Sequence, residues 1–269
     1  MGCFIIAVMG TSNPRQAAAL DGTVALITGA SSGIGEATAL DLAGRGAVVA
    51  LVARRTERLE ALAGRIREDG GTALVVQADI TEQPQAADAV ARCVTELGRL
   101  DVLVNNAGMM LLGPVLDAPL DEWERMVEVN VLGLLYCSHA ALPHLLRAAE
   151  DGPRRVADLV NISSVAGRVA REGSGVYNLT KHGVGAFSES LRQEVTGRHV
   201  RVSLVEPGAV ATELAGHNRP EILESIRGRF ADIERLHAED IADAIGYIVT
   251  RERHIAINEL LVRPTEQQG

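Results

Sequence analysis

The stretch VALITGASSGIGEATAL runs from Val24 to Leu40 and places an apolar run, a glycine-rich turn and a helical pattern in that order. Glycine allows a tight turn and lets the backbone come close to a bound pyrophosphate. The helix that follows would offer unpaired N–H groups and the positive end of its dipole. Because this arrangement opens a series of strands and helices, it predicts a nucleotide-binding turn. A merely tight turn is the alternative.

Apolar runs and amphipathic segments alternate along the rest of the chain. Several of the runs are continuous, which is typical of strands buried on both faces of a parallel sheet. The alternation predicts an α/β fold of Rossmann type, with a doubly wound parallel sheet of about seven strands and helices on both faces. Strands are expected at Val24–Thr28, Ala47–Ala53, Ala73–Gln77, Val102–Val104, Ala157–Ile162, Val202–Val205 and Leu260–Val262, and helices at Ala37–Arg45, Arg58–Asp69, Ala86–Leu97 and Leu120 to about Ala149.

The domain organisation follows from the absence of repeats, low-complexity blocks and linkers. We expect a single domain over residues 21–269 and an N-terminal extension over residues 1–20. The apolar run from Cys3 to Met9 is far shorter than the roughly 20 residues that span a bilayer, and it lacks a basic leader. A cytoplasmic location is the default expectation.

Charge and composition exclude several classes of partner. The 269 residues are 47% hydrophobic and carry a net charge of -9, so no general attraction to nucleic acid or to an anionic membrane is expected. Cys3, Cys93 and Cys137 form no C-x-x-C pair, and the seven histidines lack metal-ligand spacing. Neither a disulfide framework nor a metal site is predicted.

Two adjacent cations follow the second expected strand. An acidic residue at this place would bind a ribose 2′-hydroxyl, but the chain has Ala53 followed by Arg54 and Arg55. Cations oppose the dipole at a helix start, and a 2′-phosphate would explain them through charge-assisted hydrogen bonds. We therefore predict NADP(H) as the cofactor, with a solvated basic corner as the alternative.

The segment GVYNLTKHG, from Gly175 to Gly183, places Tyr177 and Lys181 one helical turn apart. Residues at this spacing share one face of a helix. An ordinary tyrosine has a pKa of about 10, and a neighbouring ammonium group favours the phenolate and lowers that pKa. The pair is expected to form an acid–base centre, although the same spacing also occurs by chance.

An ordered set of motifs carries a family resemblance over roughly Asp21 to Glu266. TGASSGIG, Asp79, NNAG (Asn105–Gly108), Asn130, Ser164, YNLTK and EPG (Glu206–Gly208) occur in the order and spacing of the short-chain dehydrogenase/reductase family. The segments MMLLGPV, LRQEV and INELLVRPT look most like its NADP-dependent subgroup, which contains clavulanic acid dehydrogenase, serine dehydrogenase and 3-hydroxy acid dehydrogenases.

The resemblance implies catalytic roles for Asn130, Ser164, Tyr177 and Lys181. Tyr177 would be the general acid in carbonyl reduction and the general base in alcohol oxidation. Ser164, which stands 13 residues before Tyr177, would hydrogen-bond the substrate carbonyl, and Ser163 would point elsewhere. Lys181 would also bind the nicotinamide ribose. Asparagine is a poor residue inside a helix, so a local disruption at Asn130 would free a carbonyl for an ordered water in a proton relay.

The resemblance also implies a set of cofactor contacts. Asp79 and Ile80 would contact the adenine, and Asn105 and Gly108 would lie beneath the adenosine ribose and stabilise the central sheet. Pro207, Gly208 and Thr212 would hold the nicotinamide amide and the pyrophosphate. The full predicted set is Gly29, Ser31, Ser32, Gly33, Ile34, Gly35, Arg54, Arg55, Asp79, Ile80, Asn106, Ala107, Gly108, Tyr177, Lys181, Pro207, Gly208 and Thr212.

The substrate wall is expected after Gly108, after Ser164 and in the irregular segment Glu213–Leu236, which would form a lid. Adaptable methionines suit a small molecule of medium or variable size. The expected apolar contacts are Met109, Met110, Leu111 and Val165, and the polar candidates, each of which is alternatively only solvated, are Arg168, Arg171, His217, Asn218 and Arg219.

Three features are left with open interpretations. The loop EDGPRR (Glu150–Arg155) is expected at the edge of the sheet away from the site. The stripe of Val184, Phe187, Leu191 and Val195 indicates core packing or, by resemblance, an interface in a homodimer or homotetramer. Function is expected to be NADP(H)-dependent carbonyl–alcohol interconversion, with an imine or enone reductase, or a non-catalytic NADP(H) sensor, as alternatives.

Overall fold

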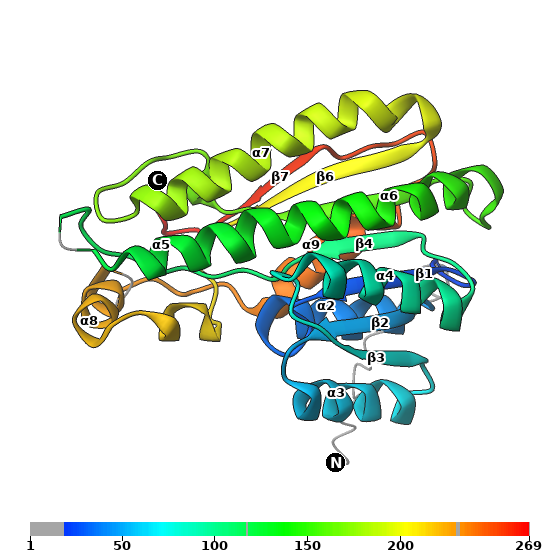
Figure 1. Ribbon diagram of the computed structural model, residues 1–269, viewed down its shortest axis with the longest axis horizontal. Coiled ribbons are helices and arrows are strands. Elements are labelled where there is room, and N and C mark those ends of the chain that lie inside the picture. Colours follow the sequence, from blue (N-terminus) through cyan, green and yellow to red (C-terminus); the bar gives the residue numbers. More distant parts are fainter. Residues whose placement is uncertain (1–18, 117, 230–231, 269) are drawn as a thin grey trace, which may run out of the picture.

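The computed structural model describes residues 19–116, 118–229 and 232–268. Within them, seven strands pair in parallel to form one sheet in the order β3-β2-β1-β4-β5-β6-β7 (Figure 1). The predicted doubly wound parallel sheet is confirmed. The strands are β1 (Val24–Thr28), β2 (Val48–Ala53), β3 (Ala73–Gln77), β4 (Val102–Asn105), β5 (Ala157–Ile162), β6 (Val200–Pro207) and β7 (Glu259–Val262).

Helices cover both faces of the sheet, as predicted. One face is packed by α4, α6 and α7, and the other by α2, α3 and α9 (Figure 1). The larger helices are α2 (Gly33–Gly44), α3 (Thr56–Glu68), α4 (Gln83–Leu97), α5 (Leu120–Val127), α6 (Leu134–Asp151), α7 (Gly175–Val195), α8 (Pro220–Arg229) and α9 (Ala238–Val249).

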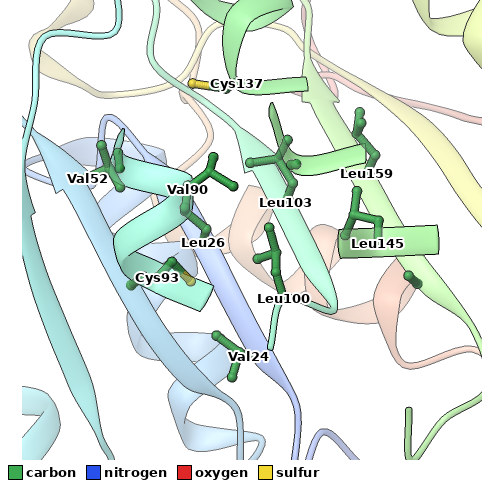
Figure 2. Packing of buried hydrophobic residues seen from close by; sticks show 14 of the residues in the cluster. Val24, Leu26, Val52, Val90, Cys93, Leu100, Leu103, Cys137, Leu145 and Leu159 are labelled. Atoms are coloured by element: carbon green, nitrogen blue, oxygen red, sulfur yellow. The ribbon is translucent and has the colours of Figure 1, made fainter. Parts of the chain in front are cut away.

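The core beneath α4 and α6 is built from aliphatic side chains and two cysteines. Figure 2 shows Leu103 and Leu159 of the sheet beside Val90 of α4 and Leu145 of α6. Cys93 and Cys137 are buried free thiols, and burial raises the pKa of each to about 12. Both thiols are therefore packing groups at neutral pH, while Cys3 lies outside the described residues.

The expected N-terminal extension mostly lies outside the described residues. Its last residue, Leu20, is fully buried and its N–H bonds the carbonyl of Arg45 at 3.0 Å. Leu20 packs in the core on the α2 side of the sheet. The domain therefore begins at least one residue before the predicted boundary at residue 21.

The long helical stretch from Leu120 is interrupted at Asn130 and not at Pro143. A π-helical turn at Glu128–Gly133 separates α5 from α6, and α6 continues through Pro143. By length and composition alone, Leu120–Asp151 is apolar enough to cross a membrane. In this fold it is a helix packed against the sheet, because Cys137, Ala141 and Leu145 belong to the buried core.

Strand β6 is two residues longer at each end than the apolar pattern predicted. The pattern stopped because Arg201 and Glu206 are charged, yet both are buried within the strand. Arg201 pairs with Asp158 of β5 and Glu206 pairs with Arg168. Ion pairing with residues distant in sequence therefore allows charged residues into a central strand.

The segment after β6 is more ordered than predicted. The expected irregular stretch contains a 3₁₀ turn at Glu213–His217, here called η4, and helix α8. The loop after α6 lies at the start of β5, where the carbonyl of Arg155 accepts a bond of 2.8 Å from Arg253 Nε. That loop is at the opposite end of β5 from the residues that follow its carboxyl end.

Candidate active site

A cavity of about 440 Å³ opens at the carboxyl ends of β1, β2, β4, β5 and β6. This is where the chain reverses direction across the sheet between β1 and β4, the usual ligand crevice of such folds. Gly35 and Asn130 of the predicted set do not line it. The predicted residues that do line it are Gly29, Ser31, Ser32, Gly33, Ile34, Arg54, Arg55, Asp79, Ile80, Asn106, Ala107, Gly108, Ser164, Tyr177, Lys181, Pro207, Gly208 and Thr212.

Three positions of the turn after β1 require glycine, either for their backbone conformation or for lack of space. Gly29 and Gly33 have φ values of +66° and +56°, which favour glycine. A Cβ at Gly35 would lie 2.4 Å from the carbonyl oxygen of Gly29 and 2.5 Å from Asn106 Nδ2. The turn therefore presents bare backbone at the N-terminus of α2, as a dinucleotide pyrophosphate requires.

The two asparagines of NNAG have different tasks. Asn106 ties its loop to the glycine turn, because its N–H donates to Thr28 Oγ1 and its Nδ2 donates to the Thr28 carbonyl, both at 3.0 Å. Asn105 is buried away from the cavity, and its Nδ2 bonds Ser138 Oγ and Asn161 Oδ1, both at 2.9 Å. The expectation that Asn105 lies beneath the ribose is therefore wrong, whereas its predicted link to the central sheet is present.

The two arginines after β2 differ in their partners. Arg54 stands 3.7 Å from Asp79, and its side chain is largely exposed. Arg55 bonds the hydroxyls of the glycine turn, with Nη2 at 3.0 Å from Ser31 Oγ and 2.8 Å from Ser32 Oγ. Arg55 is thus bonded to the glycine turn itself, while Arg54 lies at the rim of the cavity.

Ser164 and Tyr177 meet at the wall of the cavity. Ser164 follows β5 and caps a short 3₁₀ turn, η2 (Val165–Gly167), by accepting a bond of 3.1 Å from the N–H of Ala166. Its hydroxyl also faces Tyr177, near the start of α7, and favours the ionised form of that tyrosine. Ser163 points to a different partner, as predicted, and donates to the carbonyl of Lys181 at 3.1 Å.

Lys181 is buried one turn after Tyr177 and donates from Nζ to the carbonyl of Ile162 at 2.8 Å. Its Nζ is 5.9 Å from the centre of the Tyr177 ring. Burial lowers the pKa of Lys181 to about 8. Burial also raises the pKa of Tyr177 to about 12, although the Ser164 hydroxyl acts to lower that pKa. The expected lowering of the tyrosine pKa is therefore absent in the protein alone, because desolvation outweighs the distant ammonium.

Asn130 lies behind the cavity wall. Its Oδ1 accepts from the N–H of Met109 at 2.7 Å, and its Nδ2 donates to the Met109 carbonyl at 2.8 Å and to Thr180 Oγ1 at 3.1 Å. The π-helical turn around Asn130 is the local disruption that the sequence predicted. The side chain thus fastens the loop after Gly108 to α7.

Asn178 holds the loop that carries Ser164. Its Nδ2 donates to the carbonyls of Ala166 at 2.6 Å and Val169 at 3.0 Å, and its Oδ1 accepts from the N–H of Arg171 at 3.3 Å. The residue is buried next to Tyr177 on α7. This side chain therefore links the two hydroxyl-bearing segments of the site.

The apolar wall agrees with the prediction at three positions out of four. Met109, Met110 and Val165 line the cavity, whereas Leu111 is turned away and packs near Met126. The next residue, Leu112, takes the expected place in the wall. Ile226 of α8 closes it from the segment after β6.

The five polar candidates divide into two groups. Arg171 and His217 line the cavity. The other three serve the framework: Arg168 bonds Glu206 at 2.6 Å and also Glu259, Arg219 stands 3.1 Å from Glu122, and Asn218 bonds the backbone of Leu112 and Met110 at 2.7 and 2.9 Å.

The C-terminal residues contribute to the site without any sequence signal. Gln267 Oε1 accepts a bond of 2.8 Å from the N–H of Ala209, and a Cβ at Gly208 would lie 2.3 Å from the same oxygen. Gln267 lines the cavity although it was not predicted, and Arg235 lines it from the segment Glu213–Leu236, where part of the wall was expected. In the described part of the chain, no group of three or more histidine, cysteine or acidic side chains could hold a metal ion.

Comparison with known proteins agrees with this geometry. Residues 23–222 match the short chain dehydrogenase family model. The chain is 36% identical to an uncharacterized oxidoreductase of Staphylococcus saprophyticus over 91% of this chain and 96% of that protein. It is 37% identical over 95% of its length to glycine betaine reductase of Emericella nidulans, but spans only 20% of that protein.

Solved structures give the same fold and indicate the cofactor. The closed form of serine dehydrogenase complexed with NADP+ is 30% identical, with a TM-score of 0.84, over 92% of this chain and 97% of that chain. Other similar structures also contain NADP. The family model and these relatives show that the chain belongs to the short-chain dehydrogenase family and is an oxidoreductase, and the NADP complexes among the similar structures support NADP(H) as its cofactor.

Proposed function

We propose that this protein interconverts a carbonyl compound and an alcohol by NADP(H)-dependent hydride transfer, with Tyr177 as proton donor and acceptor. One observation carries the proposal. Ser164, Tyr177 and the buried Lys181 line the same cavity as the glycine turn at the N-terminus of α2. A hydride-transfer site needs a proton source beside the dinucleotide, and this arrangement supplies one.

The side chains divide the work in this proposal. The nicotinamide, when bound, supplies or accepts the hydride. Ser164 donates a hydrogen bond to the substrate oxygen, and Tyr177 gives its proton to the alkoxide that forms there. Lys181 holds the ribose and stabilises the phenolate that Tyr177 leaves, while the backbone at Asn130 connects Lys181 to solvent through a water.

The cofactor would extend from Lys181 to the arginines after β2. The pyrophosphate would lie on Gly29, Ser31–Gly35 and Thr212, the adenine near Asp79 and Ile80, and the 2′-phosphate at Arg55 with Arg54 at the rim. Asn106–Gly108 and Pro207–Gly208 complete the groove. The support for this placement is that all but Gly35 line one continuous cavity, whose turn Gly35 keeps free of a side chain.

Two alternatives use the same scaffold. An imine or enone reductase would share the groove and differ in the group it reduces, whereas an NADP(H) sensor would bind the cofactor without turnover. The apolar wall formed by Met109, Met110 and Leu112 suits a small or medium-sized substrate. A homodimeric or homotetrameric assembly belongs to the same proposal and rests on the family resemblance. A cytoplasmic location also belongs to it, as the default expectation.

A panel of aldehydes, ketones, hydroxy acids, imines and enones, followed by NADPH absorbance, tests the proposal. Turnover of carbonyls with the reverse reaction on the matching alcohols supports it. Turnover confined to imines or enones selects the first alternative. Tight NADPH binding without turnover of any member of a broad panel favours the sensor.

The pH dependence of reduction is expected to report on Lys181. Tyr177, whose pKa is about 12, keeps its proton throughout the working range, whereas Lys181, whose pKa is about 8, loses its charge as the pH rises. Reduction should therefore be level below about pH 8 and fall above it. In Lys181→Arg the residual activity should no longer fall above about pH 8, because arginine stays charged. Measurement of kcat/KM from pH 6 to 10 decides, and an unchanged fall in the variant contradicts the assignment.

Asn178→Ala is expected to slow turnover without weakening cofactor binding. The variant frees the loop between Ser164 and Arg171 from α7, and misplacement of a catalytic group by about 1 Å can cost on the order of 100-fold in rate. We expect kcat to fall about 10- to 100-fold, with the NADPH Kd unchanged. Asn178→Ser, which retains one donor, should recover part of kcat. Leu179→Ala, an exposed neighbour, is the control, and an equal loss in both variants would exclude a positioning role.

A further inference from the structure

The carboxylate of Glu213 bridges two arginines across the cofactor groove. Its Oε2 stands 3.0 Å from Arg55 Nη1, and its Oε1 and Oε2 stand 2.8 and 3.0 Å from Arg58 Nη1. Glu213 opens the turn η4 after β6, whereas Arg55 and Arg58 lie at the start of α3. The contact therefore joins two segments that are more than 150 residues apart in sequence.

Arg55 is held between this carboxylate and the glycine turn. The same guanidinium donates to the hydroxyls of Ser31 and Ser32, and all four residues line the cavity. Two hydroxyls and a forked cation form a set of donors that suits a phosphate group. Glu213 thus places an anion on the face of Arg55 that points away from the two serines.

A phosphate monoester is a stronger partner for this cation than a carboxylate. It carries a charge of about −1.5 to −2 and three acceptor oxygens near neutral pH, against one charge and two oxygens on Glu213. The ion pairs of Glu213 with Arg55 and Arg58 are about half exposed, and exposed pairs contribute little. A phosphate can therefore take Arg55 from Glu213, but the two anions repel when both remain.

We propose that Glu213 is a specificity-determining residue that competes with the 2′-phosphate of the cofactor for Arg55. The inference rests on the proposed contact between that phosphate and Arg55. The free protein keeps Arg55 paired through Glu213, and NADP(H) displaces the carboxylate. A cofactor without the phosphate leaves the Glu213 bridge in place. Displacement of Glu213 therefore reduces the gain in NADP(H) affinity that the contact between Arg55 and the 2′-phosphate provides.

Removal of the charge tests the competition by direct binding. In Glu213→Gln, the Kd of NADP+ measured by titration calorimetry should fall about two- to tenfold, the range expected when exposed ion pairs no longer oppose binding. The Kd of NAD+ should stay within about twofold, because NAD+ has no 2′-phosphate to compete with Glu213 for Arg55. Glu60→Gln is the matched control, since Glu60 is an exposed carboxylate on α3 that pairs only loosely with Arg67 at 4.0 Å. It removes the same charge and should change neither Kd.

Arg55→Ala separates failure of this inference from failure of the contact on which it rests. The variant should weaken NADP+ binding at least tenfold, an amount in the range of charged hydrogen bonds, and spare NAD+. If it weakens both cofactors equally, the proposed phosphate contact is wrong. If it behaves as expected while Glu213→Gln leaves NADP+ affinity unchanged or lower, the contact stands and the competition is overturned. An equal gain in Glu60→Gln also overturns it, because the effect would then be one of net charge.

Discussion

Tyr177→Phe is expected to lower kcat for carbonyl reduction by about 10²- to 10⁴-fold, the contribution typical of a positioned acid or base. The substitution removes only the phenolic hydroxyl. The ring should stay in place, because it packs in a buried cluster with Met109, Leu111 and Met126. Steady-state kinetics and calorimetric titration with NADPH measure the two effects separately, and the Kd of NADPH should change by less than about twofold.

The matched control for that variant is Tyr247→Phe. Tyr247 lies on α9, is about half exposed and has the guanidinium of Arg251 at 4.1 Å from its ring centre. This variant should keep the activity of the parent protein. Near-normal turnover in Tyr177→Phe would refute the proton-transfer role, and a parallel loss of NADPH binding would indicate a disturbed groove instead.

Asp158→Ala is expected to destabilise the fold by about 3–5 kcal/mol, the cost of leaving a buried charge without its partner. Asp158 is fully buried in β5, and its two oxygens accept from Arg201 Nε at 2.7 Å and Arg201 Nη2 at 3.0 Å. Arg154 also contacts the carboxylate. Removal of the acid leaves the buried Arg201 guanidinium with backbone carbonyls as partners but without its counter-charge. Urea unfolding measures the loss.

Glu96→Ala provides the comparison for Asp158→Ala. Glu96 forms an exposed i,i+4 pair with Arg92 on α4 at 2.9 Å. Its loss should change the free energy of unfolding by no more than about 1 kcal/mol. A loss of similar size in Asp158→Ala would mean that the buried pair contributes no more than a surface pair.

The sequence predicted the parts of the fold that depend on local pattern. Strands β1, β3 and β5 match their predicted limits: β1 and β3 are apolar runs that end at a polar residue, and β5 is apolar apart from Asp158 and Asn161. Helix α2 starts at Gly33, four residues before the predicted start at Ala37. The pattern excluded these residues because glycine has a low helix propensity. The ends of β6 were missed because charge reads as exposure until the partners of Arg201 and Glu206 are known.

The candidate site divides in the same way. The i,i+4 spacing of Tyr177 and Lys181 and the turn after β1 could be predicted, since both are local. The direction of the tyrosine pKa could not, because it depends on burial by side chains from other elements. Three polar residues were candidate substrate contacts in the sequence, but each binds another part of the protein. Arg168 bonds Glu206, Asn218 bonds the backbone of Leu112, and Arg219 pairs with Glu122.

Local pattern was enough to predict a parallel sheet that opens on a phosphate-binding turn and a helix with tyrosine and lysine on one face, because periodicity and glycine act over a few residues. Which charged side chains can meet a ligand depends instead on contacts between segments that are distant in sequence. Glu213 reaches Arg55 and Arg58, and Gln267 reaches Ala209, from distant parts of the chain. Such pairings depend on how the strand ends converge, which no local pattern records.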